Sequence, residues 1–404
     1  MANHAKQQSS ERVEAESWNR IFKSWLTQTA SSADDVMDAG IRRLRKRLGR
    51  IGVPAIQPYI GYATHDAIHL SGRVLTNPPI DPDFESDRWW HNLSNAIGRF
   101  ASDEVPNVKL RATAGGTVAS THSDDEGYFR FELPRETQSD DQLFWSPAIM
   151  QIDDPKSPSQ LSSTTCDVMY VPDQAEFGII SDIDDTILHT GAIDILTMAK
   201  LTFLGNARTR APLCGVAKLY EMLQHNGDIR RDPLNPVFYV SSSPWNLYDL
   251  IDDFLELNAI PKGPILLRDL GFDETKFIKE GHEHKLTKAR RLMQQFDSLP
   301  FVLFGDSGQE DARLYAAAAR EFGTRIRAIF IRDIDPGRTS EHDQRVDVHV
   351  RSAREAGVPM YLVHDSIEVA RIAIEHRLLP EEAFQEVVSA TQRDRQRKEN
   401  FLEP

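Results

Sequence analysis

The stretch EFGIISDIDDTIL, residues 176–188, decides the fold of the region around it. Its apolar residues Phe177, Ile179 and Ile180 form the run that a strand buried on both faces needs, and the run ends in three aspartates and a threonine. Charges on such a strand can reach a cleft only at its carboxyl end. Because acids this close together repel one another, the stretch predicts a hard divalent cation with oxygen ligands, and magnesium is the first choice.

Composition places the chain among soluble globular proteins. Its 404 residues are 40% hydrophobic and 27% charged, and this length predicts two domains with appendages. No apolar run approaches the roughly 18–20 residues of a membrane span, and the first residues lack the apolar core of a signal peptide. The two cysteines are too few for a disulfide framework, so we expect a cytoplasmic protein. The net charge of -14 argues against a nucleic-acid partner.

Residues 1–55 are predicted to form amphipathic helices. Apolar residues recur at helical spacing along residues 37–48, and basic residues from Arg42 to Arg50 lie on the opposite face. One interpretation is a solvated helix face docked on the rest of the protein. The other is peripheral membrane contact, in which the Arg42–Arg50 helix lies on anionic lipid with Leu44 and Leu48 buried.

The remainder of the chain shows two sequence patterns, followed by a charged tail. Residues 56–170 form short alternating segments broken by turn residues, which predict a small β-sandwich-like domain. Between residues 171 and 380, strands alternate with helical patterns, which is typical of an α/β domain with a mostly parallel, Rossmann-like sheet. Residues 381–404 are predicted to be a charged helical tail. The expected strands of the parallel sheet are Phe177–Ile180, Val237–Val240, Ile265–Leu267, Phe301–Phe304, Ala328–Ile331 and Met360–Val363.

Polar residues follow two further strands of this sheet. Residues 237–240 end in SSSPW, residues 241–245, and residues 301–304 end in GDSGQED, residues 305–311. Between them GHEHK, residues 281–285, opens a helix. Hydroxyls, a lysine and more acids thus stand where α/β proteins bind ligands.

These residue types suit phosphoryl transfer, which depends on positioning and on charge stabilisation. Asp182 can attack phosphorus once a cation and a lysine screen the approaching phosphate. Asp184 can protonate the leaving alkoxide and then activate water against the aspartyl-phosphate. Ser241 can donate a hydrogen bond to a phosphate oxygen, and Lys285 can neutralise the developing negative charge.

The acids of the two strand ends are the candidate metal ligands. Asp306 completes an oxygen-rich magnesium site with Asp182 and the carbonyl of Asp184, and Asp311 stands behind it. Asp311 has two interpretations, as a group that supports the metal site and as an ordinary acid at a helix start. Asp185 is expected to face solvent or to cap a helix.

Taken together, the motifs resemble the haloacid-dehalogenase-like phosphatase superfamily, whose four motifs occur here in the same order. More narrowly, the chain is similar to the catalytic domain of the fungal actin-patch phosphatidate phosphatases and their bacterial relatives. The resemblance covers roughly residues 170–380, and SPW at 243–245 and GDSGQ at 305–309 are its most specific pieces. It implies a haloacid-dehalogenase-like fold with a short helical cap at about residues 191–213.

The resemblance also assigns roles to residues of this chain. It implies that Asp182 is the nucleophile and Asp184 the acid/base. The lysine motif fits Lys285 best, because this residue follows a histidine and precedes a helix. Lys276 and Lys279 are nearby competitors.

The hydroxyl motif of the superfamily falls on Ser241, and Ser242 and Ser243 leave its position open. Serine before proline also commonly caps a helix, so phosphate binding and capping can coexist in this turn. Thr186 and Ser242 are expected to contact the substrate.

The sequence therefore predicts a magnesium-dependent phosphomonoester hydrolase, and the resemblance implies a phospholipid substrate, phosphatidate, with diacylglycerol and phosphate as products. Two alternatives stay open. A phosphatase of the same mechanism could act on a soluble metabolite or a phosphoprotein. The chain could instead be a lipid- or protein-binding adaptor with a vestigial phosphatase fold, which the intact set of acids, hydroxyls and lysine argues against.

Overall fold

A computed structural model describes residues 53–77, 105–135, 143–153, 163–183, 186–187, 212–268, 283–334 and 341–399. Contacts between Cα atoms divide the chain into two units, Met1–Val53 and Pro54–Pro404. The predicted N-terminal helices, with the Arg42–Arg50 stripe, lie outside the described residues, as does the predicted cap up to residue 211.

The N-terminal β-rich region forms a mixed sheet whose strands follow the order β1-β3-β2-β8-β7-β4-β5, with β6 paired to β3. β2 pairs antiparallel with β3 and parallel with β8. Alternate residues of β4, β6 and β7 are buried, so one face of these strands supplies core side chains while the other meets solvent. The strands are β1 (Val53–Pro58), β2 (Gly61–Ala63), β3 (Ala67–Asn77), β4 (Lys109–Ala114), β5 (Thr117–His122), β6 (Tyr128–Pro134), β7 (Trp145–Ile152) and β8 (Ser163–Tyr170).

A second sheet has six strands, and every adjacent pair in it is parallel. The α/β class that the sequence predicts is confirmed. In spatial order the strands are β11 (Ile265–Arg268), β10 (Val237–Pro244), β9 (Gly178–Asp182), β12 (Phe301–Asp306), β13 (Ile326–Arg332) and β14 (Met360–Val363).

Three of these strands run further than their apolar residues predict. β9 includes Asp182, β10 includes Ser241 and β12 includes Asp306. The reason is that backbone pairing does not depend on side-chain polarity, and Val240 of β10 still pairs with Asp182 of β9. The polar residues therefore belong to the strand ends, where pairing with the neighbouring strands fixes their backbone.

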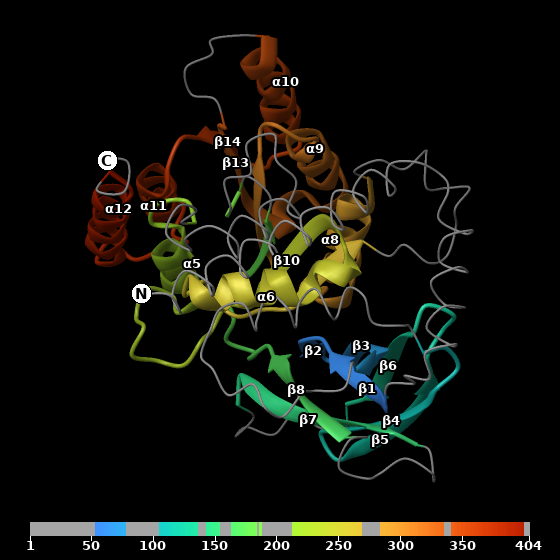
Figure 1. Ribbon diagram of the computed structural model, residues 1–404. Coiled ribbons are helices and arrows are strands. Elements are labelled where there is room, and N and C mark those ends of the chain that lie inside the picture. Colours follow the sequence, from blue (N-terminus) through green and yellow to red (C-terminus); the bar gives the residue numbers. More distant parts are fainter. Residues whose placement is uncertain are drawn as a thin grey trace, which may run out of the picture. The chain divides into compact units, whose positions relative to one another are not determined.

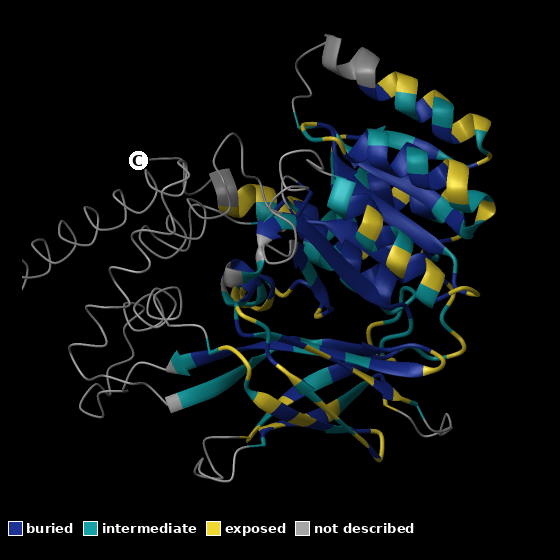
Figure 2. Cartoon of the chain, turned by 90° about the vertical axis from the view of Figure 1, so that its right-hand side faces the viewer, coloured by how far each residue is buried: buried dark blue, intermediate teal, exposed yellow. Residues whose placement is uncertain are grey.

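Helices cover both faces of the parallel sheet (Figure 1). Buried side chains of α5 (Val216–Gln224), α6 (Tyr248–Leu257), α11 (Ser366–Glu375) and α12 (Ala383–Glu399) share one hydrophobic cluster with the sheet. Those of α8 (Glu283–Gln295), α9 (Asp311–Phe322) and α10 (Glu341–Glu355) share a second cluster. As a result β9 and β12 are buried at every residue, whereas exposed residues recur along the mixed sheet (Figure 2). No described helix is both long enough and apolar enough to cross a membrane.

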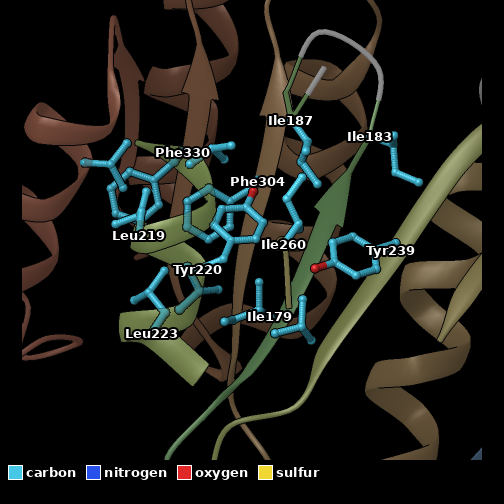
Figure 3. Packing of buried hydrophobic residues seen from close by; sticks show 14 of the residues in the cluster. Ile179, Ile183, Ile187, Leu219, Tyr220, Leu223, Tyr239, Ile260, Phe304 and Phe330 are labelled. Atoms are coloured by element: carbon cyan, nitrogen blue, oxygen red, sulfur yellow. The ribbon is translucent and has the colours of Figure 1, made fainter. Parts of the chain in front are cut away.

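Aromatic packing beneath the strand ends holds α5 in place (Figure 3). The ring centroid of Tyr220 lies 5.1 Å from that of Phe304 in β12, and Phe304 stacks on Phe330 of β13 at 5.1 Å. Leu219 and Leu223 of α5 belong to the same buried cluster. This helix face therefore rests directly on the sheet.

Side chains from outside the predicted α/β domain contribute to these clusters. Tyr59 belongs to the first cluster and Tyr62 to the second. In the predicted tail, Val387 and Thr391 of α12 are fully buried. The predicted domain boundaries (1–55, 56–170, 171–380 and 381–404) stay predictions.

Candidate functional site

Asp182 ends β9, between β10 and β12 in the parallel sheet, and its side chain is fully buried. Burying a carboxylate is costly unless charged or hydrogen-bonding groups compensate for the lost water. Thr186 is also buried, and its hydroxyl has no hydrogen-bond partner among the described residues. Asp184 and Asp185 lie outside those residues, so the acid/base and metal-ligand roles of Asp184 stay predictions.

Lys285 supplies the compensating positive charge. Its side chain is fully buried at the start of α8, and its Nζ lies 2.7 Å from Asp182 Oδ1 and 2.9 Å from Asp311 Oδ1. Nζ also donates a hydrogen bond to Gln309 Oε1 at 3.0 Å. Burial alone would lower the pKa of Lys285, but the carboxylates of Asp182 and Asp311 outweigh it and hold this pKa above its ordinary value. Lys285 is therefore a cation clamped between two buried carboxylates.

The competing lysines of the sequence, Lys276 and Lys279, lie outside the described residues. The choice of Lys285 as the motif lysine therefore stays a prediction, supported by its contact with Asp182.

The turn after β12 fixes the side chain of Asp306. Its Oδ1 accepts hydrogen bonds from the backbone N–H groups of Gly308 at 2.7 Å and Gln309 at 2.8 Å. A Cβ atom on Gly305 would lie 2.7 Å from both Cβ and Oδ2 of Asp311, so only glycine lets the first residue of α9 approach the strand this closely. The backbone thus orients Asp306 and seats Asp311 beside it.

Asp311 connects the strand end to the lysine. Its Oδ1 contacts Lys285 Nζ, and its Oδ2 accepts a hydrogen bond from the backbone N–H of Asp306 at 3.3 Å. It is also the first residue of α9 and is fully buried. Asp311 therefore stands at a helix start and contacts the backbone of the neighbouring acid, while its support of a metal site stays a prediction.

Three of the candidate metal ligands come together as a set of carboxylates that could hold a metal ion. One oxygen each of Asp182, Asp306 and Asp311 lies within 4.8 Å of the others, and all three residues are buried. With Lys285 included, the set carries three negative charges and one positive charge, so a divalent cation would balance it. Because hard divalent cations prefer oxygen ligands, these residues fit Mg²⁺.

Ser241 reaches the same edge of the sheet through strand register. Val240 pairs with Asp182, and Ser241 is the next residue of β10. The Ser241 side chain is buried, and its Oγ accepts a hydrogen bond from the backbone N–H of Ser243 at 3.0 Å. Ser242 is half-buried. The phosphate-binding role predicted for Ser241, and the substrate contact predicted for Ser242, stay predictions.

A second buried network supports the backbone of Asp182, and sequence reasoning missed it. Ser181 Oγ donates a hydrogen bond to the carbonyl oxygen of Asp182 at 2.7 Å and lies 2.8 Å from the hydroxyl of Tyr220. Because the serine has one proton to give, Tyr220 must donate to it. Burial, reinforced by the nearby Asp182 carboxylate, raises the pKa of Tyr220, so its hydroxyl keeps the proton that it donates.

A pocket lies beside this network at the ends of β12, β13 and β14. Apolar side chains of α5 and the sheet form much of its lining. Thr186, which directly follows the acidic cluster of the sequence, borders it, so the pocket adjoins the strand end that carries Asp182. Its polar lining includes Thr186, Tyr220, Arg332, Asp365 and Ser366.

Comparison with known proteins finds one matching family model over these elements. Residues 177–333 match the family described as phosphatidate phosphatase APP1, catalytic domain. The match contains the strand ends that carry Asp182, Ser241 and Asp306, together with Lys285. The resemblance that the sequence motifs indicate is confirmed.

Curated relatives match a longer part of the chain. The phosphatidate phosphatase APP1 of Saccharomyces cerevisiae is 27% identical over 291 residues, which are 69% of this chain and 47% of that protein. An uncharacterized protein of Schizosaccharomyces pombe is 27% identical over 250 residues, 59% of this chain and 39% of that protein. This chain thus spans less than half the length of both relatives. Among solved structures, a carbohydrate acetylesterase from Xanthomonas citri aligns over 74% of each chain with 12% identity and a TM-score of 0.25, too weak a likeness to bear on the fold.

Proposed function

We propose that the region similar to the catalytic domain of phosphatidate phosphatases hydrolyses phosphomonoesters through an aspartyl-phosphate on Asp182. The observation that carries the proposal is the buried contact of Lys285 Nζ with Asp182 Oδ1 at 2.7 Å. A lysine held at an aspartate on a strand end is the arrangement that an anionic substrate requires, because it attracts the phosphate towards a nucleophile of the same charge.

The sheet supports a haloacid-dehalogenase-like, Rossmann-type fold for this domain. The strand with Asp182 lies between the strands with Ser241 and Asp306, and all three are parallel. Their carboxyl ends therefore converge on one edge, which is where ligands bind in such sheets. We also propose that residues from about 191 to 213 form the short helical cap of this fold.

Each residue has a distinct part in the proposed reaction. Asp182 attacks phosphorus, and the bond from phosphorus to the leaving alkoxide breaks. Asp184 gives its proton to that alkoxide and then takes one from the water that hydrolyses the aspartyl-phosphate. Ser241 donates a hydrogen bond to a phosphate oxygen, while Lys285 balances the charge that develops there.

The proposed cofactor is Mg²⁺, which when bound would neutralise negative charge on the phosphate and the carboxylates. Asp182, Asp306 and the carbonyl of Asp184 would hold it. Asp311 would act on it through Asp306 and Lys285, because each of its oxygens contacts one of these two residues.

We propose phosphatidate as the substrate, since the yeast relative is a phosphatidate phosphatase. Diacylglycerol and phosphate would be the products. The proposed setting is the cytoplasm, with peripheral membrane contact through the Arg42–Arg50 helix. Flotation with anionic vesicles tests that contact: neutralising Arg42, Arg43, Arg45 and Lys46 should leave the protein unbound, and unchanged flotation would refute the membrane role.

Phosphate release tests the proposed function directly. The full chain would be assayed with Mg²⁺ or EDTA on phosphatidate in mixed micelles, on glycerol phosphate and on a phosphopeptide. We expect Mg²⁺-dependent release that is fastest with phosphatidate and absent in Asp182→Asn, which keeps the shape of the side chain but removes its nucleophilicity. Preference for glycerol phosphate or the phosphopeptide would show that the substrate is a soluble phosphoester and not phosphatidate. Full activity of Asp182→Asn would refute the mechanism.

A further inference from the structure

The serines of the β10 end stand in an irregular piece of strand. Val240 pairs with Leu266 and Pro244 with Arg268, so β10 uses four residues where β11 uses two. Ser241, Ser242 and Ser243 thus stand opposite the single residue Leu267, and the regular ladder of parallel hydrogen bonds cannot hold all three. Besides the hydrogen bond from the Ser243 N–H to Ser241 Oγ, contacts outside the ladder therefore help to fix the position of this serine loop, residues 241–243.

The residues that follow the serine loop are held by an aromatic stack. Trp245 begins the short helix η1 (Trp245–Leu247), and Tyr248 begins α6. The ring of Tyr59 stacks on that of Trp245, with centroids 4.7 Å apart and planes 19° apart. It also lies 4.1 Å from the ring of Tyr248. Tyr59 therefore packs against both aromatic residues that follow the loop, whose own ring centroids lie 6.1 Å apart.

Tyr59 comes from the β-rich region, between β1 and β2, and not from the α/β domain. It is 3% exposed, and its neighbour Ile60 donates a backbone hydrogen bond to the hydroxyl of Tyr248 at 2.8 Å. The Tyr59 backbone N–H donates in turn to the carbonyl of Ser71 in β3 at 2.9 Å. The stack is thus anchored to the mixed sheet on one side and to the serine loop on the other.

We propose that Tyr59 is a positioning residue for the serine loop, so that the β-rich region completes the phosphate-binding side of the active site. The inference rests on the proposed function, because it assigns Tyr59 an effect on the hydroxyl that binds phosphate. Stacked aromatic pairs contribute beyond their buried area and fix ring orientation. A displacement of about 1 Å at a phosphate-binding group can cost about 100-fold in rate.

Tyr62 provides a matched control from the same region. It is also buried between the two regions, packs on Phe238 and Phe296, and donates a hydrogen bond to Gln295 Oε1 at 2.9 Å. Gln295 ends α8, ten residues from Lys285 and so about 15 Å along the helix. Phe238 lies on β10 before the irregular stretch, where its backbone pairs regularly with β9. Loss of the Tyr62 ring should therefore weaken the contact between the regions with little effect on the serine loop.

The experiment compares Tyr59→Leu, Tyr59→Phe and Tyr62→Leu in the full chain. Each variant is assayed for phosphate release from p-nitrophenyl phosphate, for inhibition by inorganic phosphate, and for thermal unfolding. We expect Tyr59→Leu to lower kcat/KM by about 10–100-fold and to weaken phosphate inhibition in parallel. Tyr59→Phe, which keeps the stack, should restore both, and Tyr62→Leu should lower the melting temperature without changing either.

Equal kinetic losses in Tyr59→Leu and Tyr62→Leu would overturn the inference, as would full activity of Tyr59→Leu. If Tyr59→Leu does not fold, Trp245→Leu removes the same stack from the other side and must show the same kinetic loss. A wild-type chain without activity on any phosphoester would refute the proposed function instead, so the two failures are distinguishable.

Discussion

The two sheets of the molecule place similar ion pairs in opposite surroundings. In the parallel sheet, Lys285 lies 2.7 Å from Asp182 and 2.9 Å from Asp311, and all three side chains are fully buried. On β4 of the mixed sheet, Lys109 and Arg111 lie 2.8 and 3.2 Å from Asp153, with side chains 53%, 48% and 27% exposed. Distance alone therefore does not separate a candidate site from an ordinary surface ion pair.

Burial is the property that separates them. Taking charges out of water is costly, and a buried pair recovers this cost only when every charge has its partner. Exposed pairs exchange water contacts for protein contacts at almost no gain. Three buried carboxylates and one buried ammonium group at two strand ends and two helix starts are an arrangement that stability alone does not favour, which is typical of a functional site.

The largest expected effect follows from removing the buried cation. Lys285→Met leaves Asp182 and Asp311 without their shared partner, so we expect the protein to lose about 3–5 kcal/mol of stability in EDTA. Phosphate release should fall by about 100-fold or more, because a preorganised charge at the reacting group is lost. Urea denaturation and the phosphate-release assay measure the two effects.

Lys288→Met is the control, because Lys288 lies on the same helix and donates to the backbone carbonyls of Leu266 and Leu267. It should retain most of the activity and lose less stability. If Lys285→Met kept more than a tenth of the activity, the electrostatic role of Lys285 in the reaction would be wrong.

The grouping of residues at strand ends could be predicted from the sequence, whereas the tertiary contacts around them could not. Strands buried on both faces read as continuous apolar runs, and their carboxyl ends must share one edge, which is why Asp182, Ser241 and Asp306 could be grouped from sequence. The contact of Gln309 with Lys285 could not be foreseen, because it depends on how α8 and α9 pack on the sheet.

The supporting residues were still less accessible to sequence reasoning. Tyr220 falls within the apolar face of a helix and carries no motif, so nothing distinguishes its hydroxyl from that of any core tyrosine. Tyr59 lies 182 residues before Ser241 (241 minus 59), between two strands of the other sheet. Contacts between regions follow from shape complementarity, which local patterns do not encode.

The ionisation of Asp252, a partly buried acid on α6, should have an intermediate effect on stability. Burial, together with the neighbouring Asp253 and Asp249, raises the pKa of Asp252 from its ordinary 3.8 to about 6, although Lys262 opposes the change. The folded protein therefore holds this proton more tightly than the unfolded chain does, and stability falls as pH rises from about 4 to 6 and stays lower above that range. This rise in pKa corresponds to at most ~3 kcal/mol of folding stability, and residual solvation of Asp252 should reduce the loss to about 1–2 kcal/mol.

Asp252→Asn should therefore raise the urea midpoint at pH 7.5 by more than it does at pH 4.5, where the folded protein still holds the proton of Asp252. Asp253→Asn, at the exposed neighbouring position, serves as the control and should have a smaller effect at both pH values. A gain in stability that is the same at pH 4.5 and 7.5 would show that the ionisation of Asp252 is not its cause.

The smallest expected effect belongs to the ion pairs of the mixed sheet. Lys109→Gln removes the hydrogen bond that does most to lower the pKa of Asp153, yet Arg111 remains beside that carboxylate and water replaces the lost contact. We expect the urea midpoint at pH 7.5 in 150 mM salt to match that of the wild type, since exposed charges are screened there. Repeating the measurement in 20 mM salt strengthens any residual attraction, so a small drop should appear only under that condition. A drop in 150 mM salt as large as the Asp252→Asn gain would mean that exposure does not separate the ion pairs of the two sheets. The β4 face would then contribute to stability on the scale of a buried group.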